Sequence, residues 1–408
     1  MISSANAIIA QSGGPTAVIN NSVAGVFDAW YKNTAGGRLY AGISGIKGIL
    51  EGHILDLAAQ EKSVLAGLKY TPGAGLFSCR YKLGEGDSQK LLKTFKKLNI
   101  RFFFYNGGND SMDTAHKIAE AAKDNGWEMY IIGIPKTIDN DLPYTDHTPG
   151  YGSAAKYIAA TVRETGIDLE SVFTKNKVTI LEAMGRNTGW LTAAGALAKR
   201  REDEAPHLLY LPEVPFSYQL FLEDVEEVYK QLGYCYVVVS EGLADADGNY
   251  IAAAPTTDAF GHRQLSGAGE KLKNMVETEL GLKARCNTLG TTQRAAMHFA
   301  SRTDANEAYM TGQAAVMYAL AGKSRLMVTI NRLSQEPYSS AAGEIGLEKT
   351  ANIERKLPLE WINKKGNYIT NEFISYARPL IEGEVDIPIQ NGLPDYVKLD
   401  MNKGKVML

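Results

Sequence analysis

The sequence lacks the features that would direct it to a membrane, a nucleic acid or an oxidising compartment. It has only three cysteines, and Cys79, Cys235 and Cys286 show neither metal-site nor redox-pair spacing, as expected for small buried thiols in a reducing cytoplasm. The formal net charge is −3 and no basic stripe is present, which argues against a nucleic-acid partner. Glycine, proline and asparagine interrupt the apolar residues at 1–30, so we expect neither a signal peptide nor a membrane span there. These absences predict a cytoplasmic protein with no membrane partner.

The first part of the chain alternates between strand and helix patterns. Strands are expected at residues 6–11, 101–105 and 128–134, and helices at 18–30 and 112–123. A series of strand–loop–helix units predicts a parallel, doubly wound sheet, and hence an α/β fold. At 408 residues the chain is long enough for two or three domains, although no linker or low-complexity segment marks a boundary.

The alternation continues through the rest of the chain. We expect further helices at residues 88–98, 154–165, 190–199, 218–232, 271–282, 305–320 and 371–376. Further strands are expected at residues 177–182, 206–211, 234–239, 285–290 and 325–330. Asn187 or Thr188 is expected to cap the helix at 190–199, and residues 391–408 to form a tail or an edge strand.

Gly150 to Ala155 match the GxGxxA variant of a dinucleotide-binding fingerprint, which would indicate a nicotinamide oxidoreductase. The preceding residues, 142–149, are polar and interrupted by proline, so no strand leads into this turn. We therefore reject the match and expect these residues to open the helix at 154–165.

The stretch IIGIPKTIDND, residues 131–141, is the most informative part of the sequence. Its apolar start indicates the end of a buried strand, which Pro135 terminates. The loop that follows carries a lysine, a hydroxyl and two carboxylates: Lys136, Thr137, Asp139 and Asp141. Ligands of open α/β sheets bind at the carboxyl ends of strands, where one carboxylate can accept a proton from a hydroxyl and another can hold a metal ion. The alternative is an Asp/Asn-rich turn without a ligand.

Two Gly-Gly turns each join an expected strand to a helix, at Gly13-Gly14 and at Gly107-Gly108. Such a turn lets backbone N–H groups approach a phosphate closely, and the helix N-terminus favours its negative charge. A tight turn without a ligand is the alternative for the first, and a helix cap at Asp110 or Ser111 for the second.

Charged side chains also follow several later strands, namely Arg186, Glu241 and Arg294. A carboxylate at the carboxyl end of a strand could bind sugar hydroxyls. Arg80 lies near the end of the Gly-rich stretch 71–81. It is an ordinary surface arginine unless the two Gly-Gly turns bind phosphate.

Several of these motifs occur along the chain in the same order as in a known protein family: Gly13-Gly14, Gly107 to Ser111, Pro135 to Asp141, Met184 to Arg186 and Ser240 to Gly242. Together they closely resemble the phosphofructokinase family over about residues 6–335. The resemblance implies two three-layer α/β sandwich domains with mostly parallel, doubly wound sheets and an active site in the cleft between them. It implies a phosphoryl-donor domain of residues 1–145 plus about 293–335. A fructose 6-phosphate domain would then comprise residues 146–292 plus about 336–408.

The resemblance also implies roles on the sugar side of the site. Asp139 resembles the base that accepts the proton of the 1-hydroxyl of fructose 6-phosphate. The sugar would be contacted by Thr137, Asp139, Met184, Gly185, Arg186, Glu241 and Arg294. Lys177 and Arg285 fall where the family places basic residues that reach the 6-phosphate of a neighbouring subunit, which implies a homodimer or a homotetramer.

On the donor side, the resemblance assigns phosphate contacts to Gly14, Arg80 and Lys136. It places Mg²⁺ near Asn109, Asp110 and Asp141. The family loop more often has a carboxylate at the position of Asn109, whose amide oxygen is a weaker ligand.

The residues Asp110 and Lys136 indicate which donor is used. Members that use ATP resemble GGDGS and PGTIDND, with a glycine at each of these two places. Asp110 would add bulk and like charge near the α-phosphate of ATP, whereas Lys136 adds a cation for the leaving phosphate. Both residues therefore favour pyrophosphate, in a reversible glycolytic reaction. The alternatives are an ATP-dependent 6-phosphofructokinase and a non-catalytic sugar-phosphate sensor of the same fold.

Overall fold

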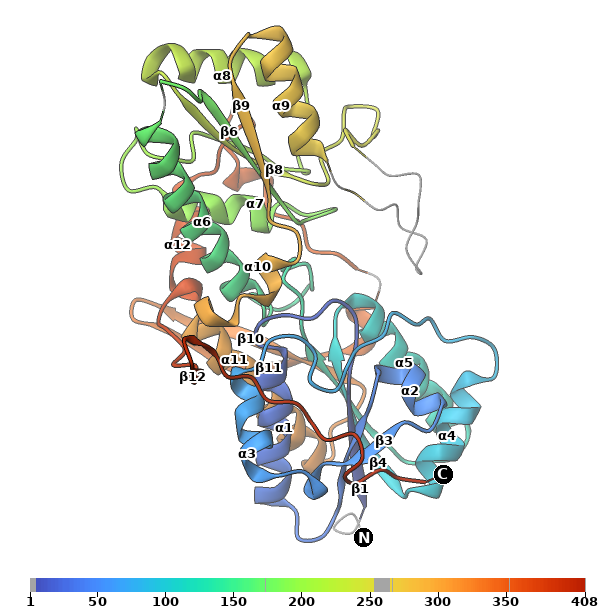
Figure 1. Ribbon diagram of the computed structural model, residues 1–408. Coiled ribbons are helices and arrows are strands. Elements are labelled where there is room, and N and C mark those ends of the chain that lie inside the picture. Colours follow the sequence, from blue (N-terminus) through green and yellow to red (C-terminus); the bar gives the residue numbers. More distant parts are fainter. Residues whose placement is uncertain (1–4, 173, 253–264, 266, 352, 408) are drawn as a thin grey trace.

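Two α/β units, each built around its own sheet, lie end to end in the computed structural model of the protein (Figure 1). The structure describes residues 5–172, 174–252, 265, 267–351 and 353–407. Among the helices of these residues, none has the length and apolar character needed to cross a membrane.

The first unit contains a seven-stranded sheet in the order β11-β10-β5-β4-β1-β2-β3. Its strands are β1 (Asn6–Gln11), β2 (Leu39–Gly42), β3 (Ile54–Asp56), β4 (Ile100–Gly107), β5 (Tyr130–Pro135), β10 (Leu326–Gln335) and β11 (Tyr338–Gly346). The five central strands run parallel, and the edge strands β3 and β11 are antiparallel to their neighbours. The parallel sheet predicted from the first strand–helix units is confirmed.

Helices cover both faces of this sheet because its central strands are apolar on both sides. On β4, Phe102 and Phe104 pack toward α1 (Ile19–Asn33) and α11 (Arg302–Leu320), whereas Phe103 and Tyr105 face the other side. That other side is covered by α2 (Gly45–Leu50), α4 (Asp87–Lys97) and α5 (Asn109–Asp124). The short helix α3 (Lys62–Gly67) lies on the α1 side (Figure 1).

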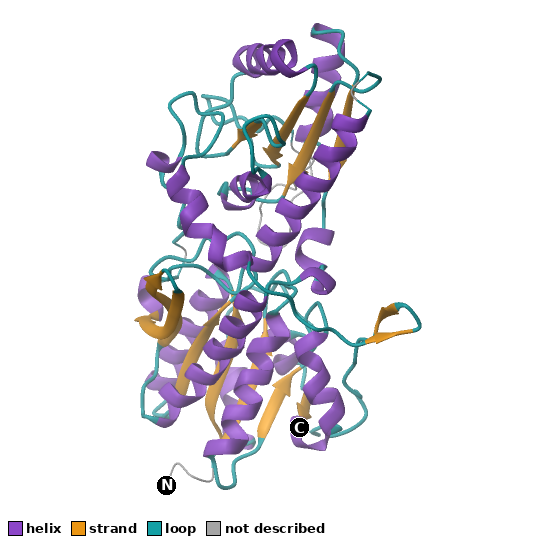
Figure 2. Cartoon of the chain, turned by 90° about the vertical axis from the view of Figure 1, so that its left-hand side faces the viewer, coloured by secondary structure: helices purple, strands orange, loops and turns teal. Residues whose placement is uncertain are grey.

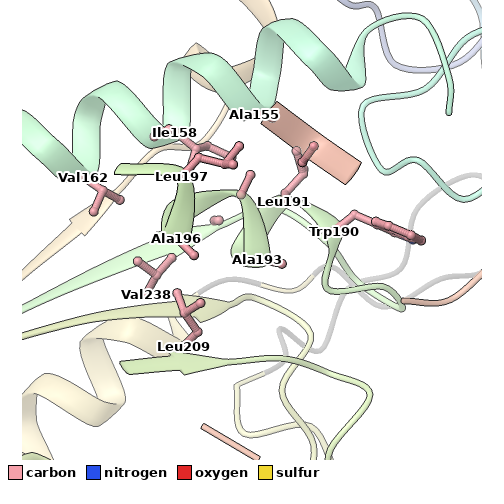
Figure 3. Packing of buried hydrophobic residues seen from close by; sticks show 14 of the residues in the cluster. Ala155, Ile158, Val162, Trp190, Leu191, Ala193, Ala196, Leu197, Leu209 and Val238 are labelled. Atoms are coloured by element: carbon pink, nitrogen blue, oxygen red, sulfur yellow. The ribbon is translucent and has the colours of Figure 1, made fainter. Parts of the chain in front are cut away.

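The second unit contains a four-stranded parallel sheet in the order β7-β8-β6-β9. Its strands are β6 (Val178–Ala183), β7 (Leu208–Tyr210), β8 (Cys235–Ser240) and β9 (Ala284–Thr288). One face packs against α6 (Tyr151–Ser171), α7 (Trp190–Ala194) and α12 (Asn371–Ala377), and the other against α8 (Tyr218–Leu232) and α9 (Ala268–Glu279). Figure 3 shows Ile158 and Val162 of α6 directed toward Leu197, with Leu209 and Val238 of the sheet beneath.

Most of the expected elements are present, and the differences are local. The strand expected at residues 325–330 is longer and continues into the hairpin β10–β11, and α2 is a short helix at a place where no helix was expected. Residues 142–149 form no strand and α6 begins at Tyr151, which confirms the rejection of the dinucleotide fingerprint. The capping prediction for the helix at residue 190 was wrong, because Gly189 occupies the cap position without a side-chain cap.

The structure corrects the division expected for residues 336–408. Of the residues described in this range, the part around α12 packs with the second sheet, whereas β11 is an edge strand of the first. The C-terminal tail also returns to the first unit, where the Val406 N–H donates to the Ile54 carbonyl and the Gly404 carbonyl accepts from the Asp56 N–H. Between α12 and the tail, β12 (Ile389–Gln390) and β13 (Leu393–Pro394) form a hairpin that projects from the body (Figure 2). These pairings follow backbone hydrogen bonding at sheet edges, for which the sequence carries no strong pattern.

Candidate active site

A cavity of about 770 Å³ lies where the carboxyl ends of strands from both sheets meet. The first sheet contributes the loops after β1, β4 and β5, and the second contributes the segments after β6 and β8. This is the position at which open α/β sheets bind ligands. The predicted site residues that line the cavity are Gly14, Arg80, Asn109, Asp110, Lys136, Thr137, Asp139, Asp141, Met184, Arg186, Glu241 and Arg294.

The first sheet presents two features suited to an anion. Gly13 has a φ of 78°, which only glycine adopts readily, in the turn between β1 and α1. Helix α5 begins at Asn109, three residues earlier than expected, so Asn109 and Asp110 lie in its first turn. The N-terminus of α5 and the Gly13-Gly14 turn therefore both lie at the cavity. Backbone N–H groups at such positions favour a negatively charged ligand.

Lys136 is held against the Gly13-Gly14 turn. Its side chain is buried, and Nζ donates a hydrogen bond of 2.7 Å to the Gly14 carbonyl. Burial lowers the pKa of Lys136 to about 8, although the nearby Asp139 and Asp141 carboxylates oppose that shift. A cation of this kind is poorly hydrated and gains from any anion that enters the cavity.

Arg294 lies against the Gly13-Gly14 turn, whereas the resemblance assigns it to the sugar phosphate. A Cβ atom added to Gly14 would be only 2.8 Å from Arg294 Nη1, so the guanidinium packs directly on the turn. Burial lowers the pKa of Arg294, and the charge of Arg80 lowers it further. Arg80, Lys136 and Arg294 thus form one cationic group around Gly14.

Asp139 and Asp141 follow Lys136 in the loop after β5 and line the same cavity. Burial raises the pKa of Asp139, and the Glu241 carboxylate raises it further. The pKa of Asp141 is raised by burial and then by the charge of Asp139. A carboxylate whose pKa is raised toward neutrality is a better proton acceptor than one at its ordinary value.

Asn140, between the two carboxylates, has a φ of 56° and is fully buried. Both ends of its amide are used: Nδ2 donates to Tyr376 Oη over 2.9 Å, and Oδ1 accepts from the Thr148 N–H over 3.1 Å. These bonds hold a backbone conformation that non-glycine residues seldom adopt.

Asn109 and Asp141 together form a candidate cation site. Asn109 Nδ2 donates to Asp141 Oδ2 over 3.1 Å. The remaining oxygens, Asn109 Oδ1 and Asp141 Oδ1, are buried and accept no hydrogen bond from the residues that the structure describes. Buried oxygens without a donor are suited to a hard cation, and Mg²⁺ is commonly held by one or two carboxylates plus substrate phosphates. Asp141 is the carboxylate that is hydrogen-bonded to Asn109, whereas Asp110 is exposed in the cavity.

The second sheet supplies a polar wall made of two adjacent strand ends. Gly185 N–H points to Glu241 Oε1 at 3.4 Å, and burial raises the pKa of Glu241 to about 7. Gly242 packs on the Arg186 carbonyl, since an added Cβ would be only 1.8 Å from that oxygen. The Thr188 hydroxyl donates to the Asp139 carbonyl over 3.1 Å and thereby joins this wall to the loop after β5.

Lys177 and Arg285 do not join the cavity of their own chain. Lys177 immediately precedes β6, and Arg285 lies beside Thr179 in the pairing of β6 with β9. Both are therefore at the amino ends of the strands, whereas Arg186 and Glu241 are at the carboxyl ends. With its amide oxygen turned toward Arg285, Asn176 accepts two hydrogen bonds from the guanidinium, at 2.9 and 3.2 Å.

Among the cavity residues that sequence reasoning did not assign to the site are Asn187 and Glu354. Asn187 Nδ2 donates to both carboxylate oxygens of Glu354, at 2.9 and 3.0 Å, instead of capping α7. Glu354 lies in an irregular segment after the hairpin β10–β11. No strand end or glycine turn marks it in the sequence, so only the fold reveals its place.

Comparison with known proteins agrees with this geometry. The phosphofructokinase family model matches residues 6–319, and the chain belongs to that family. A relative from Halomonas elongata named pyrophosphate--fructose 6-phosphate 1-phosphotransferase is 43% identical, over 97% of this chain and 96% of its own length. A relative of the same name from Methylococcus capsulatus is 42% identical over the same shares. The crystal structure of a pyrophosphate-dependent phosphofructokinase from Marinobacter aquaeolei has a TM-score of 0.91 and 42% identity, covering 99% of this chain and 98% of its own.

The raised pKa of Asp139 predicts a stability cost at neutral pH. A carboxyl whose pKa is raised on folding contributes stability below its unfolded pKa, which is lost as pH rises through the folded value. Asp139→Asn should therefore raise the thermal midpoint at pH 8, by an amount equivalent to about 1–3 kcal/mol. The gain should shrink toward zero near the ordinary carboxyl pKa of 3.8. Thermal unfolding followed by circular dichroism at both pH values measures this difference.

Asp146 is a control of opposite sign in the same loop. Burial would raise its pKa, but His147 and Arg332 outweigh burial and lower the pKa of Asp146 to about 2. Asp146→Asn should therefore lower the midpoint at pH 8. Equal destabilisation by the two substitutions at pH 8 would contradict the account of Asp139.

Proposed function

We propose that this protein transfers a phosphoryl group from Mg-pyrophosphate to the 1-hydroxyl of D-fructose 6-phosphate. The products are fructose 1,6-bisphosphate and phosphate, the reaction is reversible, and it belongs to glycolysis in the cytoplasm. One observation carries the proposal: a buried lysine, Lys136, and a partly buried carboxylate, Asp139, lie three residues apart in the loop after β5 and line the same cavity. The name shared by relatives that are 42–43% identical over nearly the whole chain supports the choice of substrates.

On the donor side, the cationic group formed by Arg80, Lys136 and Arg294 would hold pyrophosphate at the Gly13-Gly14 turn. Mg²⁺, held by Asn109 and Asp141 with help from Asp110, would neutralise charge on the transferred phosphoryl group. Phosphoryl transfer depends mainly on positioning and on charge stabilisation, and Lys136 supplies charge at the leaving phosphate without reorganisation. The buried free oxygens of Asn109 and Asp141 support this choice of metal ligands.

On the sugar side, Asp139 accepts the proton of the 1-hydroxyl as that oxygen attacks the phosphorus atom. Thr137, Met184, Gly185, Arg186 and Glu241 hold the sugar in line with the donor. The charge of Lys136, and then that of Arg186, lowers the pKa of Asp139 against the effect of burial, so the base is ionised when substrate arrives.

The donor is pyrophosphate rather than ATP because of Asp110 and Lys136. The exposed carboxylate of Asp110 projects from the first turn of α5, where the rest of a nucleotide would have to pass. Lys136 fills the space beside Gly14 and would crowd an extended donor. Like charge and lost space both act against a nucleotide and not against a donor that ends at its second phosphate.

Lys177 and Arg285 support a homo-oligomer, either a homodimer or a homotetramer. They lie together at the amino ends of β6 and β9, away from their own cavity. In such an oligomer, Lys177 and Arg285 of one copy would bind the phosphate of the sugar held in the cavity of its neighbour. Hydrogen bonds between a cation and a phosphate are stronger than those between neutral groups.

The role of Asp139 is tested by Asp139→Asn, which preserves shape but removes proton acceptance. We expect kcat to fall by roughly 10²–10⁴ while the affinity for fructose 6-phosphate changes little. Steady-state kinetics with pyrophosphate and Mg²⁺ measures both constants. A kcat close to that of the wild type would remove Asp139 from the mechanism.

The donor assignment is tested with Asp110→Gly, Lys136→Gly and the double variant. Asp110→Gly should bind ATP without using it well, because Lys136 still crowds the nucleotide. Lys136→Gly should lower kcat with pyrophosphate by about 10²–10³, since one electrostatic contact to the leaving phosphate is lost. The double variant should use ATP measurably and pyrophosphate poorly.

The measurement is kcat/KM for both donors in the wild type and the three variants, with circular dichroism as the control for folding. A folded double variant without ATP activity would show that these two residues do not select the donor.

A further inference from the structure

Arg355 is hydrogen-bonded to the loop that carries Asp139 and Asp141, although it lies more than two hundred residues further along the chain. Its guanidinium donates to three carbonyl oxygens of that loop. Nη1 donates to Thr145 and Asp146 at 2.7 and 2.5 Å, and Nε and Nη2 donate to Asn140 at 3.3 and 3.1 Å. One planar cation thus fixes both ends of the loop segment 140–146, a geometry that a lysine ammonium cannot reproduce.

The backbone of Arg355 adds a bond next to the metal ligand. Its N–H donates to the Asp141 carbonyl over 2.7 Å. The carbonyls of Asn140 and Asp141, the two residues after Asp139, therefore both bind Arg355. In the described part of the chain, no N–H group of Arg355 donates to the carboxylate of Asp139 or Asp141, so it acts on these groups through the backbone.

Arg355 is itself held in place by aromatic residues of the second unit. Its guanidinium lies 4.6 Å from the centre of the Trp190 ring, and the Trp190 indole N–H donates to the Arg355 carbonyl over 3.3 Å. Tyr376 Oη accepts from Arg355 Nη2 at 3.3 Å and donates to the Asp146 carbonyl at 2.8 Å. Trp190 opens α7 beside the sugar wall, so Arg355 connects that wall to the loop after β5.

The held segment includes a strained residue. Asn140 has a φ of 56°, a conformation that costs free energy and persists only where surrounding contacts enforce it. Its carbonyl is gripped by Arg355 and its amide by Tyr376 and Thr148. Without the guanidinium, the Asn140 carbonyl loses the side-chain donors that hold it, so the peptide group between Asn140 and Asp141 can relax and shift the neighbouring carboxylates.

We propose that Arg355 is a positioning residue for phosphoryl transfer, which fixes the backbone between the base Asp139 and the metal ligand Asp141. The inference rests on the proposed function, in which Asp139 is the base. Reactions between bound groups lose about 10²-fold in rate when the reacting atoms are displaced by roughly 1 Å. Loss of the guanidinium therefore impairs kcat more than sugar binding, which depends on the wall after β6 and β8.

Arg332 provides a matched control. It is also a partly buried arginine bound to this loop, since Nη2 donates to Asp146 Oδ1 and to the Tyr376 carbonyl, each over 2.9 Å. It contacts the far end of the loop and donates to neither Asn140 nor Asp141 among the described contacts. Its loss leaves the carboxylate of Asp146 with one fewer partner and destabilises the fold while leaving the base in place.

The experiment compares Arg355→Ala, Arg355→Lys, Arg332→Ala and Asp139→Asn with the wild type. For each protein, kcat and both KM values are measured with pyrophosphate and fructose 6-phosphate, and thermal midpoints report folding. We expect Arg355→Ala to lose about 10–10² in kcat with KM for the sugar changed by less than about threefold. Added guanidinium at millimolar concentration should restore part of the kcat of Arg355→Ala. The kcat of Arg355→Lys should lie between those of Arg355→Ala and the wild type, and Arg332→Ala should keep kcat within about threefold of the wild type.

The outcomes are distinguishable. A kcat for Arg355→Ala that equals that of Arg332→Ala, with no rescue by guanidinium, would overturn the positioning role while leaving the proposed function intact. An inactive wild type, or an Asp139→Asn variant with normal kcat, would overturn the proposed function and this inference with it. If Arg355→Ala does not fold, a folded Arg355→Lys decides: reduced kcat at unchanged sugar KM supports the role, and normal kcat rejects it.

Discussion

The structure depends on bringing one buried lysine, Lys136, and two partly buried carboxylates, Asp139 and Asp141, to the place where the edges of two sheets meet. Removing charges from water is costly, and their mutual attraction offsets that cost only when the geometry is well defined. Lys136 meets this condition through the Gly14 carbonyl, and the neighbouring carboxylates favour its charge. The rest of the site is the framework that keeps these three charges close together.

That framework is distributed over the whole chain. The parallel strands β1, β4 and β5 place three loops side by side, and the glycine turn after β1 lets Lys136 and Arg294 approach the backbone. The second sheet brings Glu241, whose charge raises the pKa of Asp139, and Thr188, which binds the Asp139 carbonyl. The C-terminal part then closes the arrangement through Arg355. Electrostatic preorganisation of this kind carries a stability cost, which the large cores of both units can bear.

Local patterns were sufficient to predict much of the fold. The strands β1 and β5 and the helix α8 are strongly periodic or uniformly apolar, and their expected ranges agree with the structure closely. The cavity residues after β5 and β6 could be predicted because the strand ends of a parallel sheet share one edge. The hairpin β10–β11 and the return of the tail to β3 could not be predicted, because edge pairing is decided by backbone hydrogen bonds between distant segments. The roles of Glu354 and Arg355 could not be predicted for a similar reason. They lie in an irregular segment, whose contacts are visible only in the folded structure.

The central claim is that the charges of Lys136, Asp139 and Asp141 serve pyrophosphate rather than a nucleotide. The most direct test offers the purified protein fructose 6-phosphate and Mg²⁺ with pyrophosphate, ADP or ATP at equal concentration, and measures fructose 1,6-bisphosphate. The account predicts product formation with pyrophosphate, at a kcat/KM at least about 10²-fold above that for ATP, the size expected for one buried electrostatic contact. It also predicts that phosphate and fructose 1,6-bisphosphate regenerate pyrophosphate. A preference for ATP, or no product with pyrophosphate, would contradict it.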